Sequence, residues 1–163
     1  MFEVSFRFLV SVLGMKTFVL VVSLLLSAAG TAWAQTPTQS VYAALLKNKP
    51  ADIEALLKAG ADANAPVEMV PGFPTTFLIL AAERSQPDVV KVLLQYKADV
   101  NKTDSFLATP LMTAAAEGNA ELVALLLTAG ANPKAKDNEG NDALAHAKKG
   151  GHAEVVKLLQ GKK

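Results

Sequence analysis

The fold of this chain is decided by the stretch Thr109-Pro110-Leu111-Met112-Thr113-Ala114-Ala115-Ala116-Glu117-Gly118. Threonine is a good N-cap, and proline fits the first helical position because its missing N–H would be unpaired there anyway. The stretch therefore predicts an alanine-rich helix that begins at Pro110 and ends before Gly118. The residues that follow, from Asn119 on, predict a second and more apolar helix. A helix–turn–helix unit this small cannot bury its own apolar face and needs neighbours of the same kind.

The chain supplies such neighbours as internal repeats. The segment at 59–64 (AGADAN) recurs at 96–101 (YKADVN) and again at 129–134 (AGANPK). Gly60 and Gly130 suit the left-handed position that ends a helix, and Lys97 replaces that glycine at a cost on the order of 1 kcal/mol. A period of about 33 residues, built from a turn and two helices, predicts a stack of such units.

On these residues the chain resembles the ankyrin-repeat family throughout residues 39–160. Residues 109–114 (TPLMTA) are the nearest match to the family's Thr-Pro-Leu-His-x-Ala, and the equivalent segments are 39–44 (QSVYAA), 76–81 (TFLILA) and 142–147 (DALAHA). The family's histidine is absent from all four segments, and its proline is present only in the third.

The resemblance implies an all-α solenoid of stacked helix–turn–helix units, joined by β-turn or hairpin segments called fingers. We expect a repeat domain at 39–163, with four repeats at about 39–65, 66–102, 103–135 and 136–163. The first and last repeats are expected to act as caps with polar outer faces. Ser40 is the expected N-cap of the first helix, after a short spacer at 35–38.

The N-terminus predicts export. Met15 and Lys16 precede an apolar run at 18–29 (FVLVVSLLLSAA), and residues 32–34 (AWA) match the small-x-small pattern of a cleavage site. We expect residues 1–34 to be a signal peptide, cut between Ala34 and Gln35, and residues 1–14 to be a misassigned start. The expected location is the periplasm or the extracellular medium. An uncleaved segment that tethers a scaffold to the membrane is the alternative.

The charge and the cysteine content of the chain exclude several kinds of partner and site. The chain after the signal carries 14 basic and 14 acidic residues (16 − 2 and 15 − 1), so nothing in the charge favours nucleic acid or an anionic membrane as a partner. The chain has no cysteine, which excludes disulfides, thiolate metal sites and a thiol nucleophile. No catalytic motif, metal site or cofactor is predicted. We expect a monomer without stable membrane insertion of the mature chain.

The histidines and repeated aspartates have structural interpretations. His152 follows Gly151 and matches the family's Gly-His between two helices, where the imidazole is generally structural. We favour a packing or surface role for His146. Asp62 and Asp99 occupy equivalent repeat positions, and so do Asp104 and Asp137. Because they repeat, these aspartates are predicted to form turn hydrogen bonds rather than an acid–base pair.

The best candidate for function is the first finger. The interval from Gly60 to Thr76 is longer by four than the intervals from Lys97 to Thr109 and from Gly130 to Asp142 (76 − 60 = 16, against 109 − 97 = 12 and 142 − 130 = 12). The extra length is an insertion within residues 65–74, and insertions in repeat arrays map to loops that often bind. The apolar residues of this loop either form a binding element or fold back as a lid over the first helices, and the sequence leaves both interpretations open.

We therefore predict a non-catalytic protein–protein interaction module that binds an unidentified partner protein through the concave face of fingers and first helices. A small-molecule or peptide-processing enzyme is a further alternative, which a buried carboxylate with a strongly shifted pKa would favour. The predicted contact residues combine the inserted loop with positions that match the family's variable surface sites: Met69, Val70, Phe73, Thr75, Glu83, Arg84, Ser105, Phe106, Glu117, Asn138 and Glu139.

Overall fold

The computed structural model describes residues 36–161 of the chain. The predicted signal peptide, the cleavage position between Ala34 and Gln35, and residues 162 and 163 lie outside the described residues. From Pro37 onward the described residues belong to one unit.

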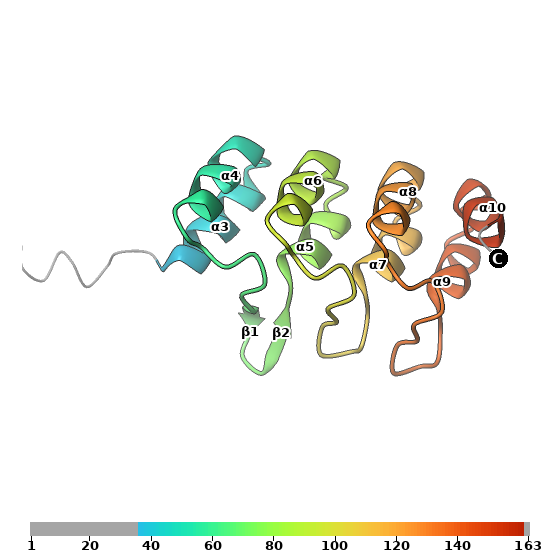
Figure 1. Cartoon of the computed structure of the whole chain (residues 1–163). Helices are drawn as coiled ribbons and strands as arrows, with labels where there is room; N and C mark the ends of the chain where they lie inside the picture. The colour runs from blue at the N-terminus through green and yellow to red at the C-terminus, as the bar shows by residue number, and fades with distance from the viewer. Residues whose placement is uncertain (1–35, 162–163) are drawn as a thin grey trace, which may run out of the picture. The chain divides into compact units, whose positions relative to one another are not determined.

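Eight helices, in four consecutive pairs, make up most of residues 36–161 (Figure 1). The first helices of the pairs are α3 (Pro37–Leu46), α5 (Phe77–Glu83), α7 (Pro110–Ala116) and α9 (Ala143–Lys149). The second helices are α4 (Pro50–Lys58), α6 (Pro87–Gln95), α8 (Ala120–Thr128) and α10 (Ala153–Gly161). The predicted all-α stack of four units is confirmed.

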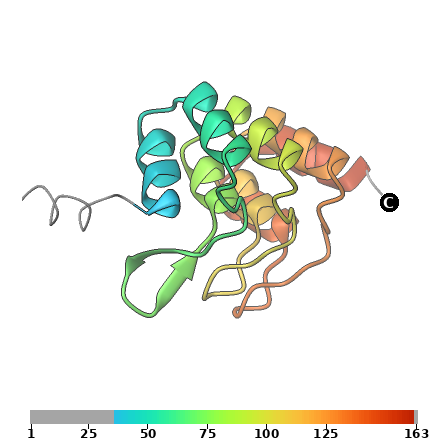
Figure 2. The ribbon, with the colours of Figure 1, turned by 60° about the vertical axis from the view of Figure 1, so that its left-hand side comes forward.

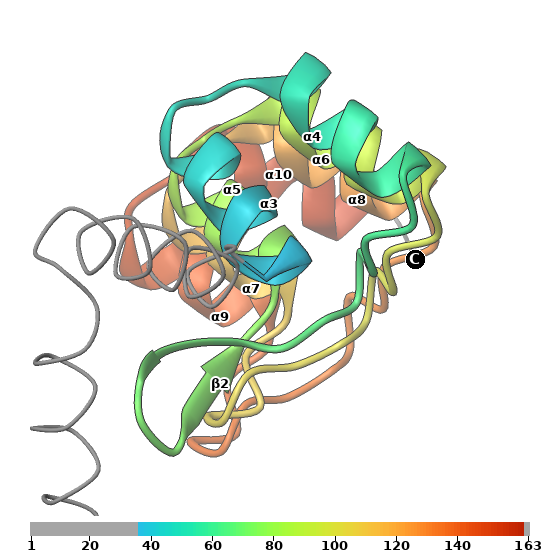
Figure 3. The same cartoon turned by 90° about the vertical axis from the view of Figure 1, so that its left-hand side faces the viewer.

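The helices pack in two rows. Contacts join α3 to α5, α5 to α7 and α7 to α9 in one row, and α4 to α6, α6 to α8 and α8 to α10 in the other. Seen along the stack, the fingers gather on one side, beneath the row of first helices (Figure 3). Residues of successive fingers therefore lie next to one another although a whole repeat separates them in the sequence.

The helix predicted to begin at Pro110 begins there, and the first helix of the last pair is capped in the same way. Thr109 Oγ1 accepts a hydrogen bond from Met112 N at 3.3 Å, and Asp142 Oδ1 accepts one from Ala145 N at 2.9 Å. The prediction that Ser40 caps the first helix is wrong, because α3 already begins at Pro37 and Ser40 lies inside it. Residues 37 and 38, which we assigned to the spacer, are helical, since the fixed φ of proline suits a first helical position.

The core fills the space between the two rows. Its largest side chains, among them Leu45, Ile53, Phe77, Leu93 and Leu122, are fully buried. Alanines on the first helices, including Ala81, Ala114, Ala115 and Ala147, are fully buried as well and let neighbouring helices approach closely.

The fingers carry the backbone from one helix pair to the next. Gly60, Lys97 and Gly130 all have positive φ (101°, 65° and 92°), so Lys97 holds a left-handed conformation that its two glycine equivalents adopt without strain. Each finger is then tied to the next through asparagine. Asn64 Oδ1 accepts from Asp99 N at 2.7 Å and its Nδ2 donates to Lys97 O at 2.9 Å.

The first finger differs from the others because it contains a β-hairpin, which projects from the stack (Figure 2). Strand β1 (Val67–Val70) pairs antiparallel with β2 (Phe73–Thr75), in the register Val67 to Thr75 and Val70 to Phe73, with an irregularity between Glu68 and Val70. Gly72 closes the turn with a φ of 83°. The insertion predicted from the sequence thus forms this hairpin.

None of the helices between residues 36 and 161 combines the length and apolar character needed to cross a lipid bilayer.

Candidate functional site

The hairpin exposes the apolar side chains that the sequence singled out. Met69, Val70 and Phe73 keep 53%, 56% and 51% of their surface accessible. Val67, at the base of the hairpin, is buried and belongs to the core cluster. The hairpin is therefore anchored by one side chain, and the other three do not cover the first helices as a lid would.

The next finger contributes a second aromatic ring to the same surface. Phe106 stacks on Phe73 with ring centroids 5.8 Å apart and an interplanar angle of 18°. Ser105 Oγ donates a hydrogen bond to Pro74 O at 3.1 Å. The hairpin and the second finger are thus joined at two points, although the partners lie one repeat apart in the sequence.

A hollow of about 360 Å³ lies between the hairpin, the second finger and the end of α5. We call it the hairpin hollow. The residues that line it are Met69, Val70, Phe73, Pro74, Thr75, Glu83, Asp104, Ser105 and Phe106. The site is an apolar depression with two carboxyl groups in its wall.

The carboxyl group of Glu83 responds to this environment. Partial desolvation of the carboxyl raises the pKa of Glu83, and the negative charges of Asp104 and Glu117 raise it further, whereas the positive charge of Arg84 lowers it. The residue as a whole remains exposed. A solvent-accessible carboxyl of this kind differs from the buried, strongly shifted group that would favour an enzyme.

Asp104 has the turn role predicted for it. Its Oδ1 accepts from the backbone N–H groups of Phe106 at 2.8 Å and Ala108 at 2.9 Å. Between them lies Leu107, which is half exposed and has a φ of 60°. A left-handed leucine is strained, and such strain is concentrated at functional sites. Leu107 adds a further apolar side chain to this finger.

Seven of the eleven predicted contact residues line the hairpin hollow: Met69, Val70, Phe73, Thr75, Glu83, Ser105 and Phe106. Arg84 follows Glu83 in the chain and is exposed, but it is not among the lining residues. Glu117, Asn138 and Glu139 are exposed outside the hollow. Sequence reasoning missed Pro74, Asp104 and Leu107. The adjacency of Asp104 to the predicted Ser105 is the signal that could have pointed to it.

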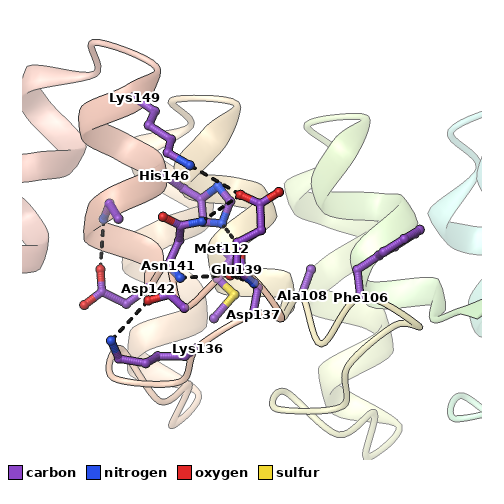
Figure 4. A network of polar contacts seen from close by, with 12 residues as sticks. Phe106, Ala108, Met112, Lys136, Asp137, Glu139, Asn141, Asp142, His146 and Lys149 are labelled. Atoms are coloured by element: carbon purple, nitrogen blue, oxygen red, sulfur yellow. Dashed lines mark hydrogen bonds and ion pairs between the residues drawn. The ribbon is translucent and has the colours of Figure 1, made fainter.

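The third finger is polar, and its acidic side chains are bound within the finger and by α9 (Figure 4). Asp137 Oδ1 accepts from Glu139 N at 3.0 Å and Asn141 N at 2.8 Å, and its Oδ2 lies 2.7 Å from Nε2 of His146. Desolvation of the carboxyl acts to raise the pKa of Asp137, but the hydrogen bonds from Asn141, His146 and Glu139 together lower it below its usual value. Lys149 Nζ lies 3.6 Å from Glu139 Oε2.

Both histidines make structural contacts. His146 is bound to Asp137 as described, and His152 Nε2 lies 2.8 Å from Ala116 O. The His152 imidazole fills the space beside Gly118 and Gly150, where any Cβ would overlap it. The structural roles predicted for the two histidines agree with these contacts. Within residues 36–161, no three His, Cys, Asp or Glu side chains are grouped so that they could hold a metal ion.

Comparison with known proteins agrees with this architecture. The family model described as "Ankyrin repeats (3 copies)" matches residues 40–137 and residues 78–163. The two matches together extend from the middle of α3 to the C-terminal residue. No curated protein matches the sequence.

Proposed function

Because the chain belongs to the ankyrin-repeat family, whose repeats are generally protein–protein interaction modules, we propose that it binds a partner protein through its fingers and first helices, with the hairpin hollow as the main contact. The fold-level relation supports protein binding in general. The choice of the hairpin hollow comes from this chain's own surface.

The observation that carries the proposal is the exposed apolar surface around the hollow. Among residues 36–161, seven large hydrophobic side chains are exposed, and five of them belong to the first two fingers: Met69, Val70, Phe73, Phe106 and Leu107. Contiguous exposed apolar surface on a soluble protein marks interaction sites, and aromatic side chains are enriched among the residues that dominate binding energy.

The hollow is also held in place before any partner arrives. The Phe73–Phe106 stack and the bond from Ser105 to Pro74 join the two walls of the hollow. Val67 anchors the hairpin to the core. A preorganised surface loses less conformational entropy on binding, so a larger share of the contact free energy appears as affinity.

We also propose that the protein works in an exported compartment, the periplasm or the medium. The support is the charged start, apolar run and small-x-small site within residues 15–34. Measurement of the intact mass of the exported protein tests this. A chain that begins at Gln35 supports export with cleavage, whereas a chain that retains residues 17–34 supports the membrane-tethered alternative.

Affinity capture from the exported compartment tests the binding proposal. The triple variant Met69→Ser, Val70→Ser, Phe73→Ser is expected to lose the proteins that the wild type retains. Its melting temperature should change little, because these side chains are half exposed.

A matched control removes apolar surface elsewhere. Leu46→Ser with Leu158→Ser changes two exposed leucines at opposite ends of the repeat unit, 41% and 36% accessible. This variant should capture the same proteins as the wild type. If the triple serine variant captures them equally well, the hairpin hollow is not the binding site.

A further inference from the structure

The hairpin hollow combines apolar surface with two carboxyl groups, and its lining contains no basic side chain. Glu83 and Asp104 both line it, and no lysine, arginine or histidine does. Within residues 36–161, neither carboxyl forms an ion pair. Arg84 is the nearest basic neighbour along the chain, but it lies outside the lining.

Comparison with the third finger shows that the hollow lacks a basic side chain next to its aspartate. Asp104 is equivalent to Asp137 of the following repeat, and the Oδ1 atoms of both accept two backbone N–H groups. The Oδ2 of Asp137 is bound by His146. The residue equivalent to His146 is Thr113, whose hydroxyl donates to Thr109 O at 3.2 Å instead.

The third finger also has a lysine–glutamate pair that the second finger lacks. Glu139 pairs with Lys149 in the last repeat, and their equivalents one repeat earlier are Phe106 and Ala116. At the C-terminal end of the stack, the acidic side chains of the finger are therefore bound by side chains of α9. In the middle of the stack, the second finger presents an aromatic ring beside a carboxylate that has no cation.

Two further acidic groups act on Glu83. Burial raises the pKa of Glu83 most and the charge of Asp104 raises it next, whereas the positive charge of Arg84 lowers it and Glu117 raises it again. The carboxylates of Glu83 and Asp104 therefore repel each other. A cation placed between Glu83 and Asp104 would relieve this repulsion. Electrostatic complementarity of this kind selects partners and orients them on an apolar contact.

We propose that the hairpin hollow binds a segment of the partner protein in which a lysine or arginine lies next to a large apolar side chain. The apolar side chain covers Phe73 and Phe106, and the cation lies against the carboxylates of Glu83 and Asp104. This inference rests on the proposed protein-binding function and adds the chemistry of the segment that is bound.

A random peptide library displayed on phage provides a defined probe. The library is selected on protein purified from cells that express the full chain, and one enriched peptide is synthesised for titration. The test variant is Glu83→Gln with Asp104→Asn, in which asparagine keeps the Oδ1 acceptor of the turn. The charge-matched control is Glu54→Gln with Glu154→Gln, two exposed carboxyl groups on α4 and α10.

Enriched peptides are expected to carry Lys or Arg beside Leu, Ile, Phe or Trp. Affinity of the synthetic peptide should fall about tenfold in the test variant and remain unchanged in the control. Raising the salt concentration should weaken binding to the wild type more than binding to the test variant, because salt screens charge pairs. Circular dichroism of each variant verifies that it is folded.

Two outcomes would overturn the inference and leave the proposed function standing. Either the peptides lack basic residues, or the test variant binds them as the wild type does, while Met69→Ser, Val70→Ser, Phe73→Ser abolishes binding. Peptides that bind this triple serine variant equally well contradict both proposals. A selection that enriches nothing contradicts the inference alone, and the capture experiment then decides the proposed function separately.

Discussion

The rings of Phe73 and Phe106 are stacked with their centroids 5.8 Å apart, and they join the hairpin of the first finger to the second finger. Both side chains are about half exposed, so little buried area holds them together. Their contact therefore matters for the shape of the hollow more than for the stability of the fold.

A double-mutant cycle should detect this contact. We expect Phe73→Ala and Phe106→Ala to show a coupling of about 0.5 kcal/mol, at the lower end of values for aromatic pairs, because the rings are partly solvated. Urea unfolding of both single variants and the double variant measures the coupling. Phe73→Ala combined with Leu158→Ala, which lies at the far end of the stack, should be additive. Additive behaviour of the two phenylalanines would contradict the stack.

The asparagines that bridge successive fingers should contribute to stability. Asn64 is bonded to the backbone of Lys97 and Asp99, and Asn101 bonds in the same way to Gly130 O at 3.3 Å and Asn132 N at 2.8 Å. We expect Asn64→Ala and Asn101→Ala each to lower the free energy of unfolding by about 1–2 kcal/mol.

The third finger offers a matched control for these bonds. Lys134 is equivalent to Asn64 and Asn101, and among residues 36–161 no further finger follows for it to bind. Lys134→Ala should change the free energy of unfolding by less than about 0.5 kcal/mol. Denaturant unfolding of the three alanine variants checks the comparison. Equal effects at all three positions would show that the bridges do not stabilise the stack.

Local signals explain how much the sequence could predict. Three kinds of feature depend only on residues close by in the chain and can be predicted from the sequence. They are the cap at Thr109, the left-handed turns at Gly60 and Gly130, and the turn bonds of Asp99 and Asp137. These signals, repeated in register, were enough to predict the four helix pairs. The start of α3 was misjudged because Ser40 and Pro37 both fit a helix N-terminus.

The geometry of the site depends on contacts between fingers, which no local signal encodes. A regular strand would place Met69 on the same face as the buried Val67, but the irregularity between Glu68 and Val70 breaks the alternation and leaves Met69 exposed. The question of lid or binding element therefore required the structure. Asp104 was predicted correctly as a turn residue, and its place in the hollow follows only from the position of the hairpin.

Lys97 should be a site where glycine is stabilising. Its φ of 65° is unfavourable for a side chain, and its equivalents are Gly60 and Gly130. We expect Lys97→Gly to raise the free energy of unfolding by up to about 1 kcal/mol, less the entropy that glycine adds to the unfolded chain. Thermal and urea unfolding measure the gain. The reverse change, Gly130→Lys, should destabilise by about 1 kcal/mol, and a loss of stability in Lys97→Gly would refute the argument.

The packing of His152 should make Gly118 less tolerant than Gly130 of replacement by a residue with a Cβ. Both glycines have positive φ, 72° and 92°, but only at Gly118 would a Cβ overlap the imidazole of His152. Gly130→Ala should cost about 1 kcal/mol for backbone strain alone, and Gly118→Ala roughly a further 1–3 kcal/mol for overpacking. Urea unfolding of the two alanine variants compares them directly. Equal costs would mean that His152 moves aside freely.

Glu83 should make the stability of the protein depend on pH. Because its pKa is raised in the folded state, the folded protein holds this proton more tightly than the unfolded chain does. The stability that the neutral carboxyl gives is present below the unfolded value of 4.5, and it is lost as the pH rises through the folded pKa. Above the folded pKa, the ionised Glu83 therefore destabilises the fold relative to the neutral carboxyl.

Replacement by a neutral isostere removes this penalty. We expect Glu83→Gln to melt at a higher temperature than the wild type at pH 7, with the difference disappearing below pH 4.5. Glu54→Gln, on the exposed face of α4, controls for the loss of one negative charge.

NMR titration of the Glu83 carboxyl measures its pKa directly. Asp104→Asn should bring the pKa of Glu83 closer to its ordinary value, because one of the two acidic neighbours is then neutral. A Glu83 pKa that Asp104→Asn leaves unchanged would show that the charge of Asp104 does not contribute to the shift.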